Sequence, residues 1–310
     1  MTQTVLITGG TGLVGKTLSK ALIKKGYQII ILTRNTADKK AETGLTYAEW
    51  NVAKQQIDMA ALQRADYIVH LAGAGVVEKK WTAAYKREIV ESRTESSRLI
   101  YEALKNNTNK VKAIVSASAT GWYGADAEPA KPFVETDPAD EDFLGQTCYE
   151  WEQSIHADSS LPIRVCNLRT GIVLSNDGGA LKAFKNPIRF GIGAILGNGK
   201  QMISWIHIED LCRLFIYALE NNSMTGPYNA VSTSPVSNKE LTLALARALK
   251  GSYFIPVHVP GFVLKLMLGK SSVEVLKSTT VSNHKVKEAG FTFLYPTIES
   301  AILELTGRRS

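Results

Sequence analysis

The sequence predicts an α/β fold, in which a doubly wound parallel sheet carries a smaller α+β C-terminal lobe. Short apolar runs alternate with longer helical patterns in the first half, which is typical of βαβ units. A glycine-rich turn joins the first apolar run to the first helical pattern. With 310 residues, 45% of them hydrophobic and 21% charged, the chain can bury a large core and still form a second lobe.

The elements of the first half follow one another in the order that such a sheet requires. The apolar runs predict strands at 5–7, 28–32, 46–50, 67–71, 113–116 and 163–168. Helical periodicity lies between them, at 13–25, at 81–105 and from about residue 147. Residues 122–144 are rich in Gly, Pro, Asp and Glu, which predicts a long loop over the carboxyl edge of the sheet.

The regular alternation weakens beyond Gly171. Six glycines between residues 178 and 199 predict a loop-rich insertion, whose segment 191–199 we expect to cover the site together with the loop 122–144. A helix at 208–220 and a short strand at 228–231 return the chain to the sheet. The predicted division is a dinucleotide-binding domain of residues 1–170 plus about 205–233, and a small lobe of about 171–204 plus 234–310.

The strongest motif is the turn Gly9-Gly10-Thr11-Gly12-Leu13-Val14-Gly15, between the first strand and the first helix. Gly9 permits a tight turn, Gly12 leaves room for a pyrophosphate, and Gly15 allows the helix to pack closely. Backbone amides and the positive end of the helix dipole then bind the phosphates. The motif therefore predicts a Rossmann domain that binds a dinucleotide, the alternative being a glycine-rich turn without a ligand. Its G-x-x-G-x-x-G spacing is typical of extended and atypical short-chain dehydrogenase/reductases.

The second strand ends in Thr33-Arg34. An acidic residue here would bind the ribose 2′-hydroxyl of NAD, whereas an arginine favours the 2′-phosphate of NADP. We therefore expect NADP(H) as cofactor, the alternative being a surface arginine. Leu71-Ala72-Gly73 follows the fourth predicted strand with small residues, and we expect the ribose of the cofactor to approach there.

The whole chain resembles the YfcH-type epimerase family of atypical short-chain dehydrogenase/reductases. The matching motifs include the glycine turn, Thr33-Arg34, His70-Leu71-Ala72-Gly73-Ala74, Ser116-Ala117-Ser118-Ala119, Arg169-Thr170-Gly171, Trp205-Ile206-His207 and Glu288-Ala289-Gly290-Phe291. The resemblance implies NADP(H), with Thr33 and Arg34 near the 2′-phosphate and Leu71-Ala72 against the ribose. It also implies that Glu88 and Arg93 lie on a helix lining this pocket, the alternative for both being a solvated helix face.

The candidate catalytic residues depart from the pattern of the larger group. Short-chain dehydrogenases move a proton with a Ser and a Tyr-x-x-x-Lys pair while hydride is transferred. Ser118 stands at the Ser position, and the resemblance puts Cys148 and Glu152 at the Tyr and Lys positions. A thiol can act as acid or base, but a carboxylate at Glu152 would raise its pKa.

Several interpretations of these residues stay open. Glu152 is either the base, or a partner of Arg169 or of a substrate cation. The plainer alternative is that Cys148 is a small buried residue and Glu152 an acid on the helix surface. Tyr123, in the loop after the fifth strand, is a further candidate phenol near the nicotinamide.

Three other motifs are interpreted as structural. Tyr101 and Lys105 form the one Tyr-x-x-x-Lys, but they precede Ser118 and read as an exposed helix end. Tyr149 is one residue off the catalytic position and would face another side of its helix. His207 and Asp210 are expected to hold the second lobe onto the first rather than to catalyse.

Composition argues against several classes of protein. The three cysteines have no paired spacing and no nearby histidine cluster, which predicts no disulfide framework, no metal site and a reducing, cytoplasmic compartment. No signal peptide and no apolar run long enough to cross a bilayer are apparent, so no membrane association is expected. The net charge of +7 comes without a dense basic block, so nucleic-acid binding is not expected either.

The predicted function is that of an NADP(H)-binding oxidoreductase or epimerase. Its substrate is a small hydroxylated or carbonyl compound, by fold-level analogy one related to nucleotide sugars. The alternative is a catalytically silent NADP(H) sensor or regulatory module. The missing Tyr/Lys pair favours that alternative, whereas Ser118 and the loops around the cleft favour the enzyme. A monomer or a homodimer is expected.

Overall fold

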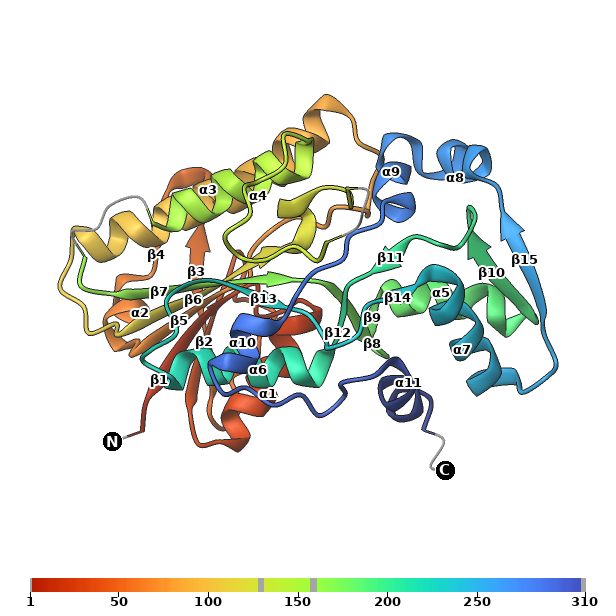
Figure 1. The fold of residues 1–310 in the computed structure, drawn as a ribbon. Coiled ribbons are helices and arrows are strands. Elements are labelled where there is room, and N and C mark those ends of the chain that lie inside the picture. The colour runs from red at the N-terminus through yellow and green to blue at the C-terminus, as the bar shows by residue number, and fades with distance from the viewer. Residues whose placement is uncertain (1, 128–130, 157–160, 308–310) are drawn as a thin grey trace.

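An eight-stranded sheet lies at the centre of the protein in the computed structural model, which describes residues 2–127, 131–156 and 161–307 (Figure 1). Its strand order is β13-β7-β6-β5-β1-β2-β3-β4, and every neighbouring pair is parallel except β3 with β4. The strands are β1 (Thr4–Thr8), β2 (Gln28–Thr33), β3 (Leu45–Asn51), β4 (Gln56–Ile57), β5 (Tyr67–His70), β6 (Ala113–Ala119), β7 (Arg164–Thr170) and β13 (Gly226–Ala230).

Helices cover both faces of this sheet, which explains why its strands are nearly continuous apolar runs. One face packs on α1 (Leu13–Lys24) and α6 (Ile208–Glu220), and the opposite face on α2 (Met59–Arg64), α3 (Ala83–Lys105) and α4 (Phe143–Ile155) (Figure 1). Residues of β1 alternate between the two cores: Val5 and Ile7 belong to one, Leu6 to the other. The predicted α/β fold with a doubly wound sheet is confirmed.

The topological switch point of the sheet lies between β1 and β5. From β1 the chain continues outward to β2 and β3, and from β5 it continues in the other direction to β6 and β7. Ligands of doubly wound folds bind in the crevice at the carboxyl ends of such a strand pair. The glycine turn and the segment from Leu71 both leave the sheet there.

A second group of elements, with its own core, lies beside the sheet (Figure 1). Leu181, Trp205, Leu241 and Ile302 are buried in that core. Its elements are β8 (Ile172–Ser175), β9 (Gly178–Gly179), α5 (Ala180–Arg189), β10 (Ile192–Leu196), β11 (Met202–Ile203), β12 (Trp205–His207), β14 (Val236–Ser237), α7 (Asn238–Lys250), β15 (Ile255–Val259), α8 (Gly261–Leu268), α9 (Ser272–Leu276) and α11 (Ile298–Thr306). The short helix α10 (His284–Glu288) returns to the main sheet, where Val286 is buried in the same core as α1 and α6. The division of the chain at particular residues stays a prediction.

Two sequence expectations about this region were wrong. The insertion predicted to be loop-rich contains α5 and β10, because apolar residues such as Leu181 and Ile188 are buried on one side of the helix. Five of its six glycines have positive φ, and three of these, Gly179, Gly191 and Gly197, stand directly at the ends of α5 and β10. The segment 191–199 is therefore largely a strand, paired with β15, and not a covering loop.

The helix α4 begins four residues before the predicted start at Thr147. It starts at Phe143 because the side chain of Asp142 accepts a hydrogen bond from the amide of Gly145, at 2.7 Å, and so caps the first turn. The acidic residues of the preceding segment, which favoured a loop in the sequence, thus supply the cap.

The start of α6 joins the two groups of elements. Asp210 is fully buried and accepts hydrogen bonds from the amides of Leu294 and Tyr295, both at 2.8 Å, and from Arg213 at 2.7 Å. His207 Nδ1 accepts from the amide of Glu209, and its Nε2 donates to a carboxylate on α11 at 2.9 Å. These contacts agree with the structural interpretation of the His/Asp motif.

Replacement of Asp210 by alanine is expected to destabilise the protein by about 3 kcal/mol, because a fully buried carboxylate is removed and two backbone amides and a guanidinium lose their acceptor. Urea unfolding followed by circular dichroism measures this loss. Asp177→Ala, at an exposed aspartate in a turn, is the matched control and should change stability by less than about 0.5 kcal/mol. Equal stability of the two variants would contradict the role given to Asp210.

Candidate dinucleotide and catalytic site

The glycine turn packs directly on the backbone that follows β5, and the contact leaves no room for a Cβ atom. Gly9 has φ +66°, and a Cβ atom there would lie 2.7 Å from the carbonyl carbon of Leu71. A Cβ atom on Gly15 would lie 2.5 Å from the carbonyl oxygen of Gly9. Both distances are shorter than van der Waals contact, so a side chain at either position would push the turn away from the strand or from α1.

The first turn of α1 is open to a ligand. Its N-cap residue is Gly12, which has no side chain to accept the free amides of the first turn, and no acidic residue lies in that turn. By contrast, the N-cap residues of α3 and α4 are Thr82 and Asp142, whose side chains accept hydrogen bonds from amides of the first turn. The amides of α1 and the positive end of its dipole are therefore available to an anion. Thr11 and Gly12 are exposed at the tip of the turn.

A buried hydrogen-bond cluster fixes the segment after β5 beside this turn. Thr8 Oγ1 accepts from the amides of Leu71 and Ala72, at 3.1 and 3.2 Å, and lies 2.7 Å from Nδ1 of His70. Thr8 therefore donates to Nδ1, and Nε2 of His70 carries the proton toward Ser97 Oγ at 3.1 Å. Burial, with the nearby charge of Arg93, lowers the pKa of His70 to about 3, so the ring stays neutral.

The end of β2 presents Arg34 to solvent. Arg34 is exposed and makes no ion pair among the described residues. Thr33 is partly buried, and its hydroxyl donates to the carbonyl oxygen of Asn35 at 3.2 Å. The strand β2 is the neighbour of β1, so Arg34 lies at the same edge of the sheet as the glycine turn.

The two residues predicted on the pocket helix lie in different environments. Glu88 is exposed on α3, and one of its oxygens lies 3.4 Å from Nζ of Lys79. Arg93 is mostly buried, with its guanidinium carbon 4.9 Å from the centre of the Trp151 ring and Nη1 donating to the carbonyl of Ile89 at 2.8 Å. The solvated interpretation thus fits Glu88 but not Arg93.

Ser118 and Glu152 meet in a buried ionic cluster. The hydroxyl of Ser118 donates to Glu152 Oε1 at 2.6 Å. Arg169 donates to both oxygens of Glu152, from Nε at 2.8 Å and from Nη2 at 2.9 Å. Burial lowers the pKa of Arg169, but the hydrogen bonds and the charge of Glu152 raise it by more, and the net pKa lies above its usual value. Glu152 is therefore a buried partner of Arg169 and not an acid on the helix surface.

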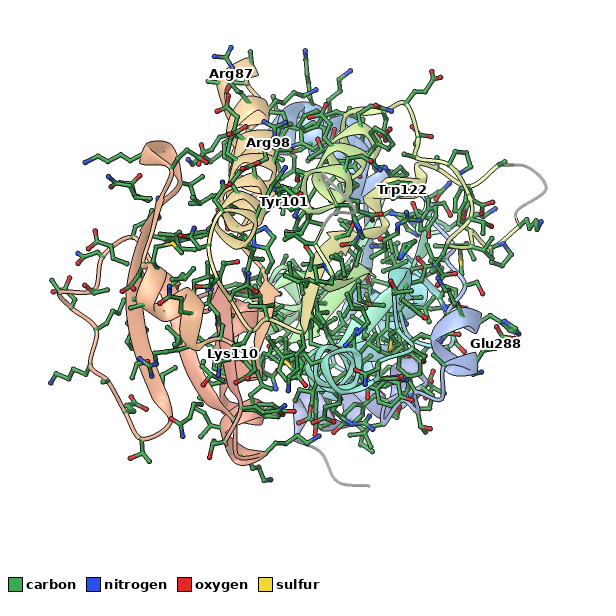
Figure 2. The ribbon with its side chains drawn as sticks, turned by 90° about the vertical axis from the view of Figure 1, so that its left-hand side faces the viewer. Arg87, Arg98, Tyr101, Lys110, Trp122 and Glu288 are labelled. Carbon is green, nitrogen blue, oxygen red and sulfur yellow. The ribbon has the colours of Figure 1, made fainter. Side chains whose placement is uncertain are left out.

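Tyr123 belongs to the same cluster. Its hydroxyl donates to Oδ1 of Asn229 at 2.6 Å and accepts from Arg169 at 3.0 Å, and its ring stacks on Phe133. Burial raises the pKa of Tyr123 to about 12 although Arg169 lowers it. Trp122 completes the cluster, since the centre of its ring lies 3.5 Å from the guanidinium carbon of Arg169 (Trp122 is labelled in Figure 2). Sequence reasoning missed Trp122 and Asn229, which lie far from Glu152 along the chain.

Cys148 lies one turn before Glu152 on α4 and is buried. Burial raises the pKa of its thiol to about 12; the charge of Arg93 acts in the opposite direction, and that of Glu152 in the same direction. The thiol is therefore protonated at neutral pH, which fits a hydrogen-bond donor and not a base. The neighbouring Tyr149 is 45% exposed, on another side of the helix, as expected.

Hydrogen bonds and an ion pair join the predicted loop after β6 to the C-terminal part of the chain. It begins as a 3-10 turn, Thr120–Tyr123, and its residues 128–130 lie outside the described residues. Asp126 accepts hydrogen bonds from the hydroxyls of Ser278 and Thr280, both at 2.8 Å. Lys277 lies 3.1 Å from Asp142 at the end of the segment. The loop thus packs on residues that follow α9.

Tyr101 and Lys105 lie near the amino ends of the strands, away from the carboxyl ends where Ser118 stands. Tyr101 lines a cavity with Ile114 and Val165, close to the amino ends of β6 and β7, and is labelled on α3 in Figure 2. Lys105 is the last residue of α3 and is exposed. This separation from Ser118 agrees with the structural interpretation of the pair.

Residues 2–127, 131–156 and 161–307 contain neither of two further features. No group of three or more His, Cys, Asp or Glu side chains there could hold a metal ion. Among the helices of that part, none is sufficiently long and apolar to span a bilayer.

The native protein is expected to show no fast-reacting thiol with a disulfide reagent at pH 8. Cys148, Cys166 and Cys212 are all buried, and burial raises each pKa to about 12, so the thiolate form is scarce. The absorbance of the released thiolate should report three thiols only after denaturation. One fast thiol that disappears in Cys148→Ser would contradict the burial of that side chain, with Cys212→Ser as the matched control.

Comparison with known families gives matches along most of the chain. Residues 5–231 match the NAD dependent epimerase/dehydratase family, and residues 259–305 match a domain of unknown function, DUF1731. An epimerase family protein of Staphylococcus aureus (strain NCTC 8325 / PS 47) is 36% identical over 304 residues, which are 97% of this chain and 98% of that protein. Epimerase family protein YfhF of Bacillus subtilis (strain 168) is 32% identical over 98% of both chains.

Solved structures agree with this assignment. The human epimerase family protein SDR39U1 (isoform 2), solved with NADPH, superposes with a TM-score of 0.87 at 27% identity, over 99% of this chain and 100% of that one. A nucleoside-diphosphate sugar epimerase of Corynebacterium glutamicum gives a TM-score of 0.78 at 29% identity, over 99% of this chain and 59% of that one. Together with the matched sequence motifs, these likenesses confirm the resemblance inferred from the sequence: the chain belongs to the NAD dependent epimerase/dehydratase family.

Proposed function

We propose that this protein binds NADP(H) and acts as an oxidoreductase or epimerase on a small hydroxylated or carbonyl substrate. The observation that carries the proposal is that no side chain caps the first turn of α1. The glycine turn before it lies at the topological switch point, where Gly9 contacts Leu71. The family assignment and the NADPH in the human SDR39U1 structure support it.

The residues around the switch point fit a dinucleotide. The amides of Leu13, Val14 and Gly15 receive the pyrophosphate, since no side chain caps them. Gly9 and Gly12 keep Cβ atoms out of the turn, and the segment Leu71-Ala72-Gly73 lies beside it.

NADP(H) is favoured over NAD(H) by the end of β2. Arg34 is exposed and free of an ion pair among the described residues, so its guanidinium is available to the 2′-phosphate. Thr33 lies next to it and offers a hydroxyl. No acidic residue stands at this position to bind a ribose 2′-hydroxyl.

The catalytic arrangement that we propose has no Tyr-x-x-x-Lys pair. The bound nicotinamide supplies or accepts the hydride. The hydroxyl of Ser118 donates its hydrogen bond to Glu152. The lone pairs of the Ser118 oxygen therefore remain to accept a hydrogen bond from a substrate hydroxyl. Glu152 is held by Arg169 and orients Ser118. Cys148 is protonated at neutral pH and is a hydrogen-bond donor for a substrate oxygen. Tyr123 accepts a hydrogen bond from Arg169 and so helps to hold the guanidinium in place.

Replacement of Arg34 by alanine is expected to weaken NADPH binding by about tenfold or more and to leave NADH binding unchanged, because only NADPH carries the 2′-phosphate. Fluorescence titration of the purified chain with each nucleotide measures both dissociation constants. Arg64→Ala is the matched control, since Arg64 is exposed at the end of α2, close to the amino edge of the sheet.

Two outcomes would count against the cofactor assignment. If neither nucleotide binds the wild-type chain, the glycine turn has no dinucleotide and the proposed function falls. If NADPH and NADH bind equally well and Arg34→Ala changes neither constant, the protein binds a dinucleotide without preference for the 2′-phosphate.

A second candidate function is a silent NADP(H)-binding sensor. It is favoured by the closed cluster at Glu152, in which Arg169 occupies both carboxylate oxygens and leaves no free base. In that case the protein would pass the redox state of the cofactor to a partner without turnover.

Turnover separates the two functions. NADPH oxidation over a panel of carbonyl compounds, together with epimer formation from nucleotide sugars in the presence of NADP+ followed by NMR, is expected to identify a substrate. Ser118→Ala should lower kcat by about a hundredfold or more while NADPH still binds. Ser116→Ala, a buried serine on the same strand, is the control and should retain activity. A panel without any turnover, with normal NADPH binding, would favour the sensor.

A further inference from the structure

The small two-stranded sheet of β10 and β15 has an apolar face that the described residues leave uncovered. The two strands are parallel and in register, so the side chains of paired residues stand on the same face. Gly193 and Ile195 of β10 are buried on the inner face. The outer face carries three apolar pairs, none of whose members is buried: Ile192 with Ile255, Ala194 with Val257, and Leu196 with Val259.

The helix α8 follows β15 directly and extends this apolar surface. Seven of its eight residues are apolar or glycine, yet Leu264 alone among these eight described residues is buried. Phe262 is 75% and Leu266 is 79% exposed. A helix that is apolar on nearly all sides is normally buried against a partner. Figure 1 shows β15 and α8 at the outer end of the small lobe, far from the main sheet.

The free edge of β15 is poorly suited to pairing with a further strand. The amide of Ile255 donates to the carbonyl oxygen of Gly191, on the side of β10. Successive residues of a strand direct their N–H groups to opposite edges, so the outer edge belongs to the next residue, Pro256, which has no N–H group. Proline on an edge strand opposes edge-to-edge pairing, which argues against a second copy of β15 there.

The positive charge of the chain is concentrated in the two segments that build this surface. Residues 178–208 and 241–273 each contain four Lys or Arg and no Asp or Glu, so together they account for the whole net charge of +7. Four of these cations lie next to the exposed apolar residues along the chain and form no ion pair with a described residue: Arg189, Lys250, Lys265 and Lys270.

An apolar surface with cations and no anions around it suits a partner that is anionic and apolar. Two copies of the surface placed face to face would bring like charges together, which opposes self-association. The side chains of Phe262 and Leu266 project from the surface, as their exposure shows. A fluid bilayer receives projecting apolar side chains without a matching cavity, whereas a folded partner would need one.

We propose that the small lobe binds the surface of an anionic lipid bilayer through α8 and the outer face of β10 and β15. Phe262, Leu266 and Ile255 enter the region below the headgroups, and the long stems of Lys265 and Lys270 keep their charges at the level of the lipid phosphates. Such peripheral binding needs no helix that spans the bilayer, and none is present among the described residues. The inference does not depend on the proposed function.

The test is sedimentation of the purified chain with lipid vesicles. Phosphatidylcholine vesicles with about 30% phosphatidylserine should bind the wild type at least about tenfold more strongly than pure phosphatidylcholine vesicles. The double variant Phe262→Ser/Leu266→Ser should lose about tenfold or more in partition coefficient, because two apolar side chains no longer leave water. Lys265→Gln/Lys270→Gln should lose about tenfold on anionic vesicles and depend less on salt.

Matched controls replace the same kinds of side chain elsewhere on the surface. Leu303→Ser removes an exposed leucine of α11, and Lys24→Gln removes an exposed lysine in the last turn of α1. Both should bind vesicles like the wild type. Because every replaced side chain is exposed, Tm of each variant should stay within about 2 °C of the wild type.

Insertion of α8 has its own readout. The fluorescence of Phe262→Trp, measured against the wild type, should shift to shorter wavelength with anionic vesicles and be quenched by brominated lipid chains, because the indole leaves water for the bilayer. Binding without such a shift would mean that the lysines attract the vesicle while α8 stays in water, which would contradict the proposed insertion.

Three further outcomes would overturn the proposal. Equal binding of the wild type and Phe262→Ser/Leu266→Ser would place the lipid contact elsewhere. No sedimentation with anionic vesicles would reject a bilayer and leave this surface to an acidic segment of a protein. A dimer in analytical ultracentrifugation that dissociates in Phe262→Ser/Leu266→Ser would make the surface a contact between two copies of the chain.

Discussion

The hydrogen bond between Thr8 and His70 is the interaction on which the rest of the candidate site depends. It lies at the ends of β1 and β5, the two strands on either side of the switch point. Thr8 also accepts the amides of Leu71 and Ala72, so the segment after β5 cannot move away from the glycine turn. Because His70 is fully buried and neutral, this cluster adds no charge next to a site built to receive phosphates.

Two arginines then give the cleft its chemical character. Arg169 is neutralised by Glu152 and serves to hold that carboxylate, and through it Ser118, in one orientation. Arg93 lacks such a partner and lies closer to the switch point, against Trp151. Arg169 thus belongs to a filled ionic cluster with little freedom, whereas Arg93 carries a charge that no carboxylate of the described residues pairs.

Seven of the eight strands of the main sheet, all except β4, could be predicted from the sequence together with α1 and α6, because their apolar patterns are clear and glycine or turn residues mark their ends. The pattern failed where glycines were frequent: α5 and β10 were missed, since the same residues that suggested a loop form the turns at the ends of these elements. The early start of α4 was missed for a similar reason, because Asp142 in an acidic segment was not recognised as a cap.

The sequence by itself determined the dinucleotide turn, the arginine at the end of β2, and a Ser118 without the usual Tyr-x-x-x-Lys pair. Each of these depends on a few neighbouring residues whose spacing sets the local backbone. Only the tertiary structure decided that Glu152 is paired with Arg169, that Tyr123 is buried on Asn229, and that Glu88 is solvated while Arg93 is not. Burial and charge pairing join residues far apart in the chain, 106 positions for Tyr123 and Asn229, and no local pattern records them.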